Sequence, residues 1–303
     1  MAPEAPLTYI IVLTWNGWED TEACLRSLLP VCNDRTRLLV VDNGSSDGTP
    51  AKVRQAFPGV ELIENGANLG FPGGNNVGIR RALAAGAEYI VLLNNDTEVD
   101  GRFAVELVQA AQRNPAAGMI SSLVYVYGSE NVIWFAGGSV STWTGRSRHA
   151  GYLDVDRGQY AGDRTIDRPC ACALLVTRRF LEVVGLMRED LFLYGEEIDW
   201  ALRSRKHGFR CILAPRSKVW HKVSSSTGGS RTPSFLYYAT RNSLMVLRDQ
   251  APVGGLLSRM REWIVLLVFL GAVLRLNMDR RGGIRNVLHG YRDYREDVTG
   301  PRP

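Results

Sequence analysis

The chain has 303 residues, of which 45% are hydrophobic and 22% are charged, a balance that is typical of globular proteins and argues against a disordered or fibrous chain. Its net charge of +5 favours anionic partners such as phosphates or lipid headgroups. No long basic run interrupts the first two-thirds of the chain, whereas six arginines crowd its last part: Arg259, Arg261, Arg275, Arg280, Arg281 and Arg285. This distribution argues against a nucleic-acid groove and for a tail that faces a membrane.

The cysteines and the N-terminus point to a reducing compartment. Five cysteines without a CxxC pair indicate neither a disulfide framework nor a zinc ribbon. Cys170 and Cys172 would share one face of a strand, and we expect small buried residues there rather than a metal or redox pair. The N-terminal residues lack the basic segment and the long apolar stretch of a signal peptide. We therefore expect a cytoplasmic protein.

The first third of the chain alternates predicted strands with predicted helices. Short apolar runs rich in Ile, Val and Leu predict strands buried on both faces at residues 9–14, 37–41 and 89–93. Apolar residues at helical spacing and turn signals predict helices at residues 19–29, 49–57 and 75–85, the last one after a glycine-rich loop. This order predicts an α/β fold with a mainly parallel sheet and right-handed crossovers.

The pattern weakens over residues 118–168, where we expect loops and short strands. Beyond it we predict a strand at residues 171–177, a helix at 179–184, a helix at 197–207 that Gly208 ends, and a strand at 210–214 before Pro215. Residues 263–274 are apolar but shorter than the roughly 20 residues that span a bilayer. Because a tryptophan opens this segment and arginines flank it, it fits a membrane interface, packing on the domain, or a homodimer contact.

Polar residues follow the three predicted parallel strands, at the sheet edge where ligands bind in such folds. They are Thr14, Asn16, Asp42, Asn94, Asn95 and Asp96. Asp42 suits hydrogen bonds from a pyrimidine or a ribose, and equally suits an Asx turn. Asp96 suits a hard divalent cation that bridges two phosphates, and equally suits a helix N-cap. The residues alone leave both choices open.

Six segments together resemble glycosyltransferase family 2, in particular its rhamnosyltransferase-like branch. They read VLTWNG, VVDNGSSDGT, ENGANLGFPGGNNVGI, VLLNNDTEV, FLYGEEIDWALRSRKHGF and VWHKVSSSTGG, and they lie in the family's order over residues 9–248. The resemblance implies a GT-A type nucleotide-binding fold and an inverting, metal-dependent transfer of a sugar from a nucleoside-diphosphate donor to a hydroxyl acceptor. It divides the chain into a nucleotide-sugar-binding half at 1–117, an acceptor and catalytic half at 118–250, and a helical tail at 251–303 that associates with membrane or oligomerises.

The resemblance also implies roles for single residues. Donor-binding residues would be Thr14, Asn16, Asp42, Asn68, Gly70, Gly73, Gly74, Asn75, Asn94 and Asn95. Asp96 would bind Mg²⁺ or Mn²⁺, with His221 as a second ligand, and the loop at 222–229 would close over the diphosphate. Asn94 stands where the family's first aspartate would be, so the metal site loses one charge.

Three carboxylates lie at the start of the helix predicted at 197–207. Asp199 is four residues before Arg203, which predicts an ion pair along the helix, and Glu196 complements the helix dipole. By resemblance Glu197 is the general base, with Glu196 and Asp199 as supporting residues, although aspartate is more usual at the position of Glu197.

Two other functions fit parts of the sequence. Residues 44–48 match the G-x-S-x-G nucleophile elbow, which would make Ser46 the nucleophile of an α/β serine hydrolase with Asp199 and His221. The strand-end loops would also suit a non-catalytic nucleotide-sugar-binding protein, but the retained carboxylates argue against it. The branch resemblance favours dTDP-rhamnose as donor and a glycan or lipid-linked acceptor. The basic tail adds an anionic membrane surface as a partner, for a peripheral protein at the inner face of the plasma membrane, and we expect no nucleic acid.

Overall fold

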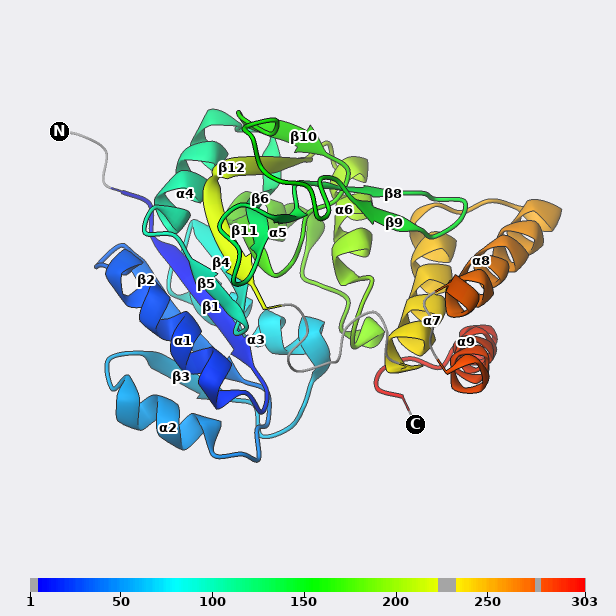
Figure 1. Ribbon diagram of the computed structural model, residues 1–303, viewed down its shortest axis with the longest axis horizontal. Coiled ribbons are helices and arrows are strands. Elements are labelled where there is room, and N and C mark those ends of the chain that lie inside the picture. The colour runs from blue at the N-terminus through cyan, green and yellow to red at the C-terminus, as the bar shows by residue number, and fades with distance from the viewer. Residues whose placement is uncertain (1–4, 223–232, 276–278, 303) are drawn as a thin grey trace.

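The computed structural model describes residues 5–222, 233–275 and 279–302, and Figure 1 shows them as a central sheet with helices on both faces and three further helices at one side. Within these residues the main sheet has ten strands, in the order β10-β12-β6-β11-β4-β1-β2-β3, with β5 beside β12 and β7 beside β6. The segment at 223–229, expected to close over a diphosphate, lies outside the described residues.

The predicted strands of the first third are all present. They are β1 (Thr8–Thr14), β2 (Thr36–Asp42) and β4 (Tyr89–Asn94), and β3 (Glu61–Glu64) extends the row beyond β2. β1 pairs in parallel with both β2 and β4, and its apolar side chains are buried on both faces. The continuous apolar runs therefore predicted doubly covered strands correctly.

Two of the first three helices match their prediction and the third starts earlier. α1 is Trp18–Leu28, α2 is Thr49–Ala56 and α3 is Gly70–Ala84. The glycine-rich segment is thus the first part of α3 rather than a loop before residue 75. The glycines let α3 approach β1 closely: a Cβ on Gly74 would lie 2.5 Å from the Leu13 Cδ1, so a side chain there would require the Leu13 side chain or the helix to move.

The second half holds two long strands that the sequence predicted poorly. Residues 118–168 were expected to contain only short strands, yet β6 (Ala117–Val126) is a fully covered central strand. The strand predicted at 210–214 continues through Pro215 as β12 (Arg210–His221), with an irregular register between Ala214 and Lys218. That irregularity accommodates the proline, which cannot donate to a regular ladder.

The remaining elements of this half are mostly short. The strands are β5 (Thr97–Val99), β7 (Ile133–Phe135), β8 (Gly138–Val140), β9 (Ser147–His149), β10 (Arg164–Ile166) and β11 (Ala173–Thr177). The helices are α4 (Phe103–Arg113), α5 (Arg178–Val184) and α6 (Glu196–Lys206), with 3₁₀ turns at Leu29–Val31 and Glu189–Leu191. β11 runs antiparallel between β4 and β6, whereas β12 is parallel to β6. The strands β3, β2, β1, β4, β6 and β12 consequently share one direction, which confirms a mainly parallel sheet.

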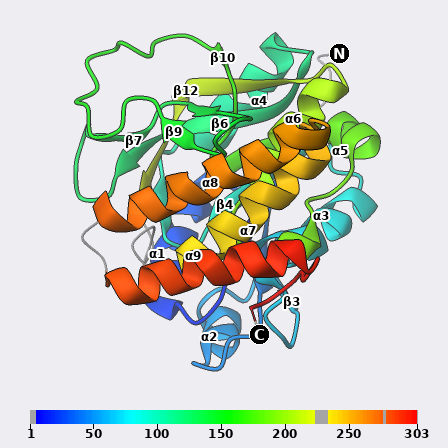
Figure 2. The ribbon, with the colours of Figure 1, turned by 90° about the vertical axis from the view of Figure 1, so that its right-hand side faces the viewer.

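The chain ends in three helices: α7 (Pro233–Gln250), α8 (Gly255–Arg275) and α9 (Arg280–Arg295). α7 packs its Leu244 and Leu247 into a cluster with Leu191 and Leu202 of the sheet domain, and α8 and α9 lie outside α7 (Figure 2). The apolar segment at 263–274 is part of α8. Within the described residues, no helix combines the length and the apolarity that crossing a membrane requires.

Candidate active site

The ends of β1, β2 and β4 are level, so the loops that follow them meet at one edge of the sheet. Thr14 pairs with Asp42, and Leu13 pairs with Asn94. Asn16, whose φ is +50°, accepts a hydrogen bond from the Ser46 N–H (2.7 Å), and its own N–H donates to the Ser45 Oγ (2.9 Å). Asn16 therefore ties the first loop to the second and fixes the shape of this edge.

Thr14 and Asn95 are engaged with α1. The Thr14 Oγ1 lies 2.8 Å from the Thr21 Oγ1, and the Asn95 Nδ2 donates to the Thr21 Oγ1 (3.1 Å). All three side chains are buried. This network orients the start of α1 against β4, so the contribution of Thr14 and Asn95 to the edge in this structure is to position it.

Asp42 forms the predicted Asx turn with one carboxylate oxygen and leaves the other oxygen without a partner among the described residues. Its Oδ2 accepts hydrogen bonds from the N–H groups of Gly44 (3.1 Å) and Ser45 (3.0 Å), which is the predicted Asx-type turn. Its Oδ1 is buried and has no hydrogen-bond partner among the described residues. A buried carboxylate oxygen without a donor costs free energy, so a donor on a bound ligand would stabilise this residue.

Asn43, which sequence reasoning missed, organises the approach to α3. Its Nδ2 donates to the Asn68 Oδ1 (3.0 Å) and to the Gly70 carbonyl (3.1 Å), and its Oδ1 accepts from the Leu69 N–H (3.2 Å). The predicted donor residues Gly73, Gly74 and Asn75 then form the first turns of α3. Asn68, Gly70 and these three residues are thus brought together beside the ends of β1 and β2.

Asp96 and His221 come from opposite parts of the chain and meet. The strand β12 ends at His221, whose Nε2 lies 3.0 Å from the Asp96 Oδ1, and both residues are buried. Burial lowers the pKa of the imidazole, but the hydrogen bond with Asp96 and the charge of that carboxylate outweigh it, so the pKa of His221 is raised overall. The predicted metal-ligand pair is therefore a contact in the fold, whereas the N-cap alternative is wrong because β5 rather than a helix follows Asp96.

This pair has the donor chemistry of a divalent-cation site. A carboxylate oxygen and an imidazole nitrogen both bind such cations, and neighbouring ligands about 2.1 Å from an octahedral cation lie about 3 Å apart. Within the described residues no third His, Cys, Asp or Glu joins them in a group that could hold a metal. These two side chains could supply two ligands to a cation, and oxygens of a bound diphosphate or of water could supply others.

The three carboxylates at the start of α6 have different surroundings. Asp199 is fully buried and accepts from the Arg203 Nε (2.7 Å) and the Gln250 Nε2 (2.9 Å), which confirms the predicted ion pair. Glu196 is buried with its Oε2 unpartnered among the described residues, and burial followed by the charge of Glu197 raises the pKa of Glu196 well above its ordinary value. Glu197 alone is partly open, with a side chain that is 21% exposed.

Arg168, which sequence reasoning also missed, contacts Glu197. Its Nη1 donates to the Glu197 Oε1 (3.3 Å) and to the Pro169 carbonyl (3.0 Å), and its guanidinium is buried over the Phe135 ring. A buried guanidinium requires such acceptors. Arg168 lies in the irregular segment where no periodicity marks a residue as important, so no signal in the sequence singled it out.

The turn at 170–172 connects this carboxylate to the Asp96–His221 pair. Cys170 and Cys172 are buried, as predicted, and their Sγ atoms lie 3.2 Å apart. The hydrogen bond between the thiols chiefly lowers the pKa of Cys170, and the charges of His221 and Arg168 lower it further. The Asn94 N–H donates to the Cys172 carbonyl (3.0 Å), so this turn connects the end of β4, which leads to Asp96, with the segment that carries Arg168.

The Trp134 ring packs between His221 and His149. The Trp134 ring contacts the His221 ring edge to face at 4.8 Å and the His149 ring at 4.7 Å. Burial, and then the charge of Arg168, lower the pKa of His149 to about 4, so His149 is neutral at neutral pH. The Trp134 ring covers this side of His221 and keeps water from it, which strengthens electrostatic interactions within the Asp96–His221 pair.

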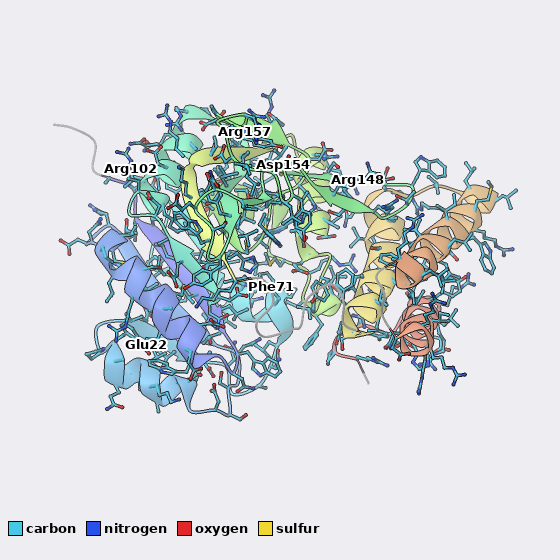
Figure 3. All side chains as sticks on the ribbon, in the orientation of Figure 1. Glu22, Phe71, Arg102, Arg148, Asp154 and Arg157 are labelled. Carbon is cyan, nitrogen blue, oxygen red and sulfur yellow. The ribbon has the colours of Figure 1, made fainter. Side chains whose placement is uncertain are left out.

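A cavity of about 510 Å³ opens beside this aromatic cover. It is lined by Ala136, Gly137, Gly138, Ser139, Arg148, His149, Ala150, Tyr160, Arg164, Thr165, Ile166 and Asp167. Its wall adjoins Arg168, because the Gly138 carbonyl accepts from the Arg168 N–H (3.1 Å). Figure 3 shows Arg148 on the β8–β9 hairpin, on the side that faces the C-terminal helices.

A side chain of α7 hydrogen-bonds to the loop that leads into α6. The Asn242 Nδ2 donates to the carbonyls of Leu191 (2.9 Å), Leu193 (2.8 Å) and Tyr194 (2.7 Å). On its other side the Phe192 carbonyl accepts from the N–H of Phe71 in α3 (2.8 Å; Figure 3). The loop before Glu197 is thus hydrogen-bonded to α3 on one side and to α7 on the other.

The serine-hydrolase alternative does not fit these contacts. The Ser46 hydroxyl contacts the Asn16 Oδ1 (3.4 Å), while Asp199 pairs with Arg203 and His221 with Asp96. A triad requires its three members to be hydrogen-bonded in sequence, and here each proposed member has another partner.

Comparison with known proteins agrees with this geometry. The sequence model described as Glycosyl transferase family 2 matches residues 9–178. The chain is 27% identical over 242 residues to the N-acetylglucosaminyl-diphospho-decaprenol L-rhamnosyltransferase of Mycobacterium tuberculosis (strain CDC 1551 / Oshkosh), which covers 72% of this chain and 77% of that protein. It is 23% identical over 268 residues to the dTDP-rhamnosyl transferase RfbF of Shigella flexneri, covering 86% of each.

Solved structures share the fold at low identity. The structure of GalNAc-T7 with UDP, GalNAc and Mn²⁺ superposes with a TM-score of 0.65 at 12% identity, over 98% of this chain and 57% of that one. The Pyrobaculum calidifontis mannosyltransferase PcManGT, in complex with GDP-Man and Mn²⁺, gives 0.60 at 17% identity, over 97% and 88%. These likenesses confirm the predicted GT-A type fold with C-terminal helices. The chain belongs to glycosyl transferase family 2 and is an enzyme of glycosyl transfer.

Proposed function

We propose that the protein is an inverting glycosyltransferase that moves a sugar from a nucleoside diphosphate to a hydroxyl, with Glu197 as the general base. The observation that carries this proposal is that neighbouring residues of β7 contact both pairs. The Trp134 ring packs against His221, which pairs with Asp96, and the Phe135 ring packs against Arg168, which pairs with Glu197. One pair suits the diphosphate and its cation, and the other suits the attacking hydroxyl.

Glu197 is suited to be the base because it is the carboxylate of the three that is accessible. It accepts one hydrogen bond from Arg168 (3.3 Å), which orients the side chain while leaving oxygen lone pairs for an acceptor hydroxyl. Such a carboxylate takes the hydroxyl proton as the oxygen attacks the anomeric carbon. Attack from the face opposite the diphosphate inverts the anomeric configuration.

Asp96 and His221 would hold Mg²⁺ or Mn²⁺, and the cation would neutralise charge on the departing diphosphate. Asp42 would accept from the nucleoside through its unpartnered Oδ1, with Asn16 and the Asn43–Asn68 contact shaping the same edge. Because Asn94 replaces a carboxylate in this site, we expect the affinity for the cation to depend on the donor's own phosphates.

The cavity of about 510 Å³ would receive the acceptor. Arg148 has no carboxylate partner among the described residues, and Arg164 donates to the carbonyls of Gln159 and Ala161, so their positive charge is available to an anionic group. A phosphate-bearing acceptor fits this lining, as in the relative named for a diphospho-decaprenol substrate. That relative and the relative named a dTDP-rhamnosyl transferase together favour dTDP-rhamnose and a lipid-linked acceptor for this chain.

A binding and product screen would test the proposal. The purified protein is titrated with nucleoside diphosphates and their sugars with and without Mg²⁺ or Mn²⁺, followed by thermal unfolding, because a ligand of the native state raises the apparent melting temperature. We expect stabilisation by dTDP or dTDP-rhamnose only with the cation, and transfer of rhamnose to a polyprenyl-diphosphate-linked sugar. If none of the nucleoside diphosphates stabilises the protein with either cation, the proposed function is wrong.

The acceptor cavity has its own test. Arg148→Ala is expected to raise the KM for a diphosphate-bearing acceptor by roughly three- to tenfold, since a partly exposed ion pair contributes about 1 kcal/mol, while the KM for the donor is unchanged. Arg157→Ala, at an exposed loop arginine outside the cavity, is the matched control. An equal effect of the two substitutions would place the acceptor elsewhere.

A further inference from the structure

The helix α8 carries an apolar stripe that nothing in the described structure covers. Its members are spaced at helical intervals and are exposed to between 48% and 74%: Leu256, Met260, Trp263, Leu267 and Leu274. At 3.6 residues per turn their side chains fall within an arc of about 60° and extend over about 27 Å. Val265 and Val273, on the other side of the helix, are fully buried. The stripe is therefore the outer face of α8 and is not part of the core.

Unpaired arginines surround this stripe. Arg259 and Arg275 lie on either side of it, and Arg280, Arg281 and Arg285 follow in the first turns of α9. All five are exposed, and none of their guanidinium groups has a hydrogen bond or ion pair in the described structure. The nearby carboxylates are occupied: Glu262 accepts from Arg295 (3.1 Å), and Asp279 caps its own helix. The positive charge around the stripe is consequently uncompensated.

We propose that this outer face of α8 and α9 binds an anionic lipid surface, with α8 lying in the plane of the headgroups. An apolar stripe enters the boundary of the acyl chains, and flanking arginines pair with lipid phosphates, when a helix lies in a membrane interface. Trp263 suits the interface because its ring is amphipathic. The same arginines would repel one another if two copies met face to face on this stripe, so charge complementarity favours lipid over a second copy.

The proposed lipid-binding surface includes exposed apolar residues of α9. Ile284 and Leu288 are four residues apart on α9 and are 38% and 47% exposed, and Figure 2 looks directly onto the layer that α8 and α9 form outside α7. Val287 and Gly283 face inward and are buried. Lipid contact would therefore leave α7 and the sheet domain undisturbed. The inference concerns the outer face of α8 and α9 and does not depend on which sugar is transferred.

Vesicle sedimentation tests the inference. The full chain is mixed with phosphatidylcholine vesicles that contain about 30% phosphatidylglycerol, or none. We expect binding to the anionic vesicles that weakens at high salt, and at least about tenfold weaker binding to the neutral ones. Leu267→Glu together with Leu274→Glu should weaken binding to the anionic vesicles by about tenfold or more, and so should Arg280→Glu together with Arg281→Glu.

Matched controls lie on other faces of the molecule. Val105→Glu places an acid on an apolar residue of α4 that is 49% exposed, and Arg157→Glu reverses an exposed arginine of a loop; both should bind vesicles as the parent does. Point substitutions are preferable to deletion, because α8 and α9 bury Leu266 and Val287 with Leu236 of α7. Circular dichroism checks the fold, and the arginine pair tests the surface even if the leucine pair unfolds the protein.

Two results would overturn the inference. The first is a parent protein that does not bind anionic vesicles. The second is a pair of leucine substitutions that converts a dimer into a monomer in sedimentation velocity while vesicle binding stays unchanged, which would assign the stripe to a second copy. Donor binding measured with dissolved nucleotide is independent of the vesicles, so failure here is distinguishable from failure of the proposed transfer reaction.

Discussion

The two acidic centres of this protein, Asp96 with His221 and the carboxylates of α6, are built in opposite ways. Asp96 gains its partner from a strand that ends 125 residues later along the chain, and the two buried groups face each other at 3.0 Å. Glu196, Glu197 and Asp199 are neighbours in sequence, yet Asp199 is tied to Arg203, Glu196 is buried, and Glu197 alone is accessible. A carboxylate that is buried and paired, such as Asp199, thus has a structural role, whereas the accessible Glu197 is the candidate base, although both are acidic residues.

Removing Asp199 should have the largest effect, and it should be on stability. Asp199→Ala leaves the Arg203 and Arg188 charges beside a buried gap, and losing one member of a buried pair costs about 3–5 kcal/mol. Urea unfolding measures this loss. Asp154→Ala, at an exposed aspartate, should change the free energy of unfolding by no more than about 0.5 kcal/mol; equal effects would contradict a structural role for Asp199.

Glu197→Gln should lower turnover by roughly 10²-fold or more, as the loss of a general base does, with donor affinity nearly unchanged. Steady-state kinetics and calorimetric titration of the donor separate the two quantities. Glu196→Gln serves as the neighbouring control and should cause a clearly smaller loss. Near-normal turnover of the Glu197 variant together with an inactive, folded Glu196 variant would move the base to Glu196.

Asp96→Asn should weaken cation-dependent binding of a nucleoside diphosphate by about tenfold or more, because a carboxylate ligand of a divalent cation is replaced by a neutral amide. Binding measured in EDTA should be the same for both proteins. Asn94→Asp is the reverse change, since it adds a carboxylate two residues before Asp96, where the family resemblance implies one, and it should strengthen cation-dependent binding. Unchanged affinity for the nucleoside diphosphate in both variants would show that the cation does not bind at this edge of the sheet.

Glu196→Gln should have the smallest effect, and it should appear as a pH dependence. Burial raises the pKa of the folded Glu196 above its ordinary 4.5, so the folded state binds a proton that the unfolded state has lost, and this residue destabilises the fold increasingly as pH rises above about 4.5. The variant should therefore gain stability relative to the parent as pH rises above about 4.5, which urea unfolding at a series of pH values measures. A difference that is flat with pH would contradict this environment for Glu196.

The sequence predicted most reliably what depends on local pattern. Continuous apolar runs identified β1, β2 and β4, and the register of those strands placed Thr14, Asp42 and Asn94 at one edge. The helix ion pair of Asp199 with Arg203 also follows from spacing alone. These features require only neighbours in the chain or in adjacent parallel strands.

What the sequence missed depends on contacts between distant, irregular segments. Arg168 and Trp134 lie where no periodicity exists, and their importance arises from Glu197 and His221, which join them only after folding. Glycine disfavours helices, so the glycines before residue 75 predict a loop, whereas in the fold they belong to α3, where the absence of side chains allows the helix to lie close to β1. The sequence predicts that the strand ends before Pro215, but β12 continues to His221 because the register shift between Ala214 and Lys218 accommodates a residue without an N–H.

The side chain of Asn242, which holds three carbonyls of the loop before α6, has a consequence for biosynthesis. A ribosome makes the strands β1 to β4 long before it makes α7, so the sheet edge that we propose for the nucleotide can assemble while the loop at 191–195 still lacks the Asn242 amide that orders it. We expect a nascent chain that ends before residue 242 to have a formed first half and an unplaced base. The polypeptide would thus acquire its capacity to bind a donor earlier in its synthesis than its capacity to use one.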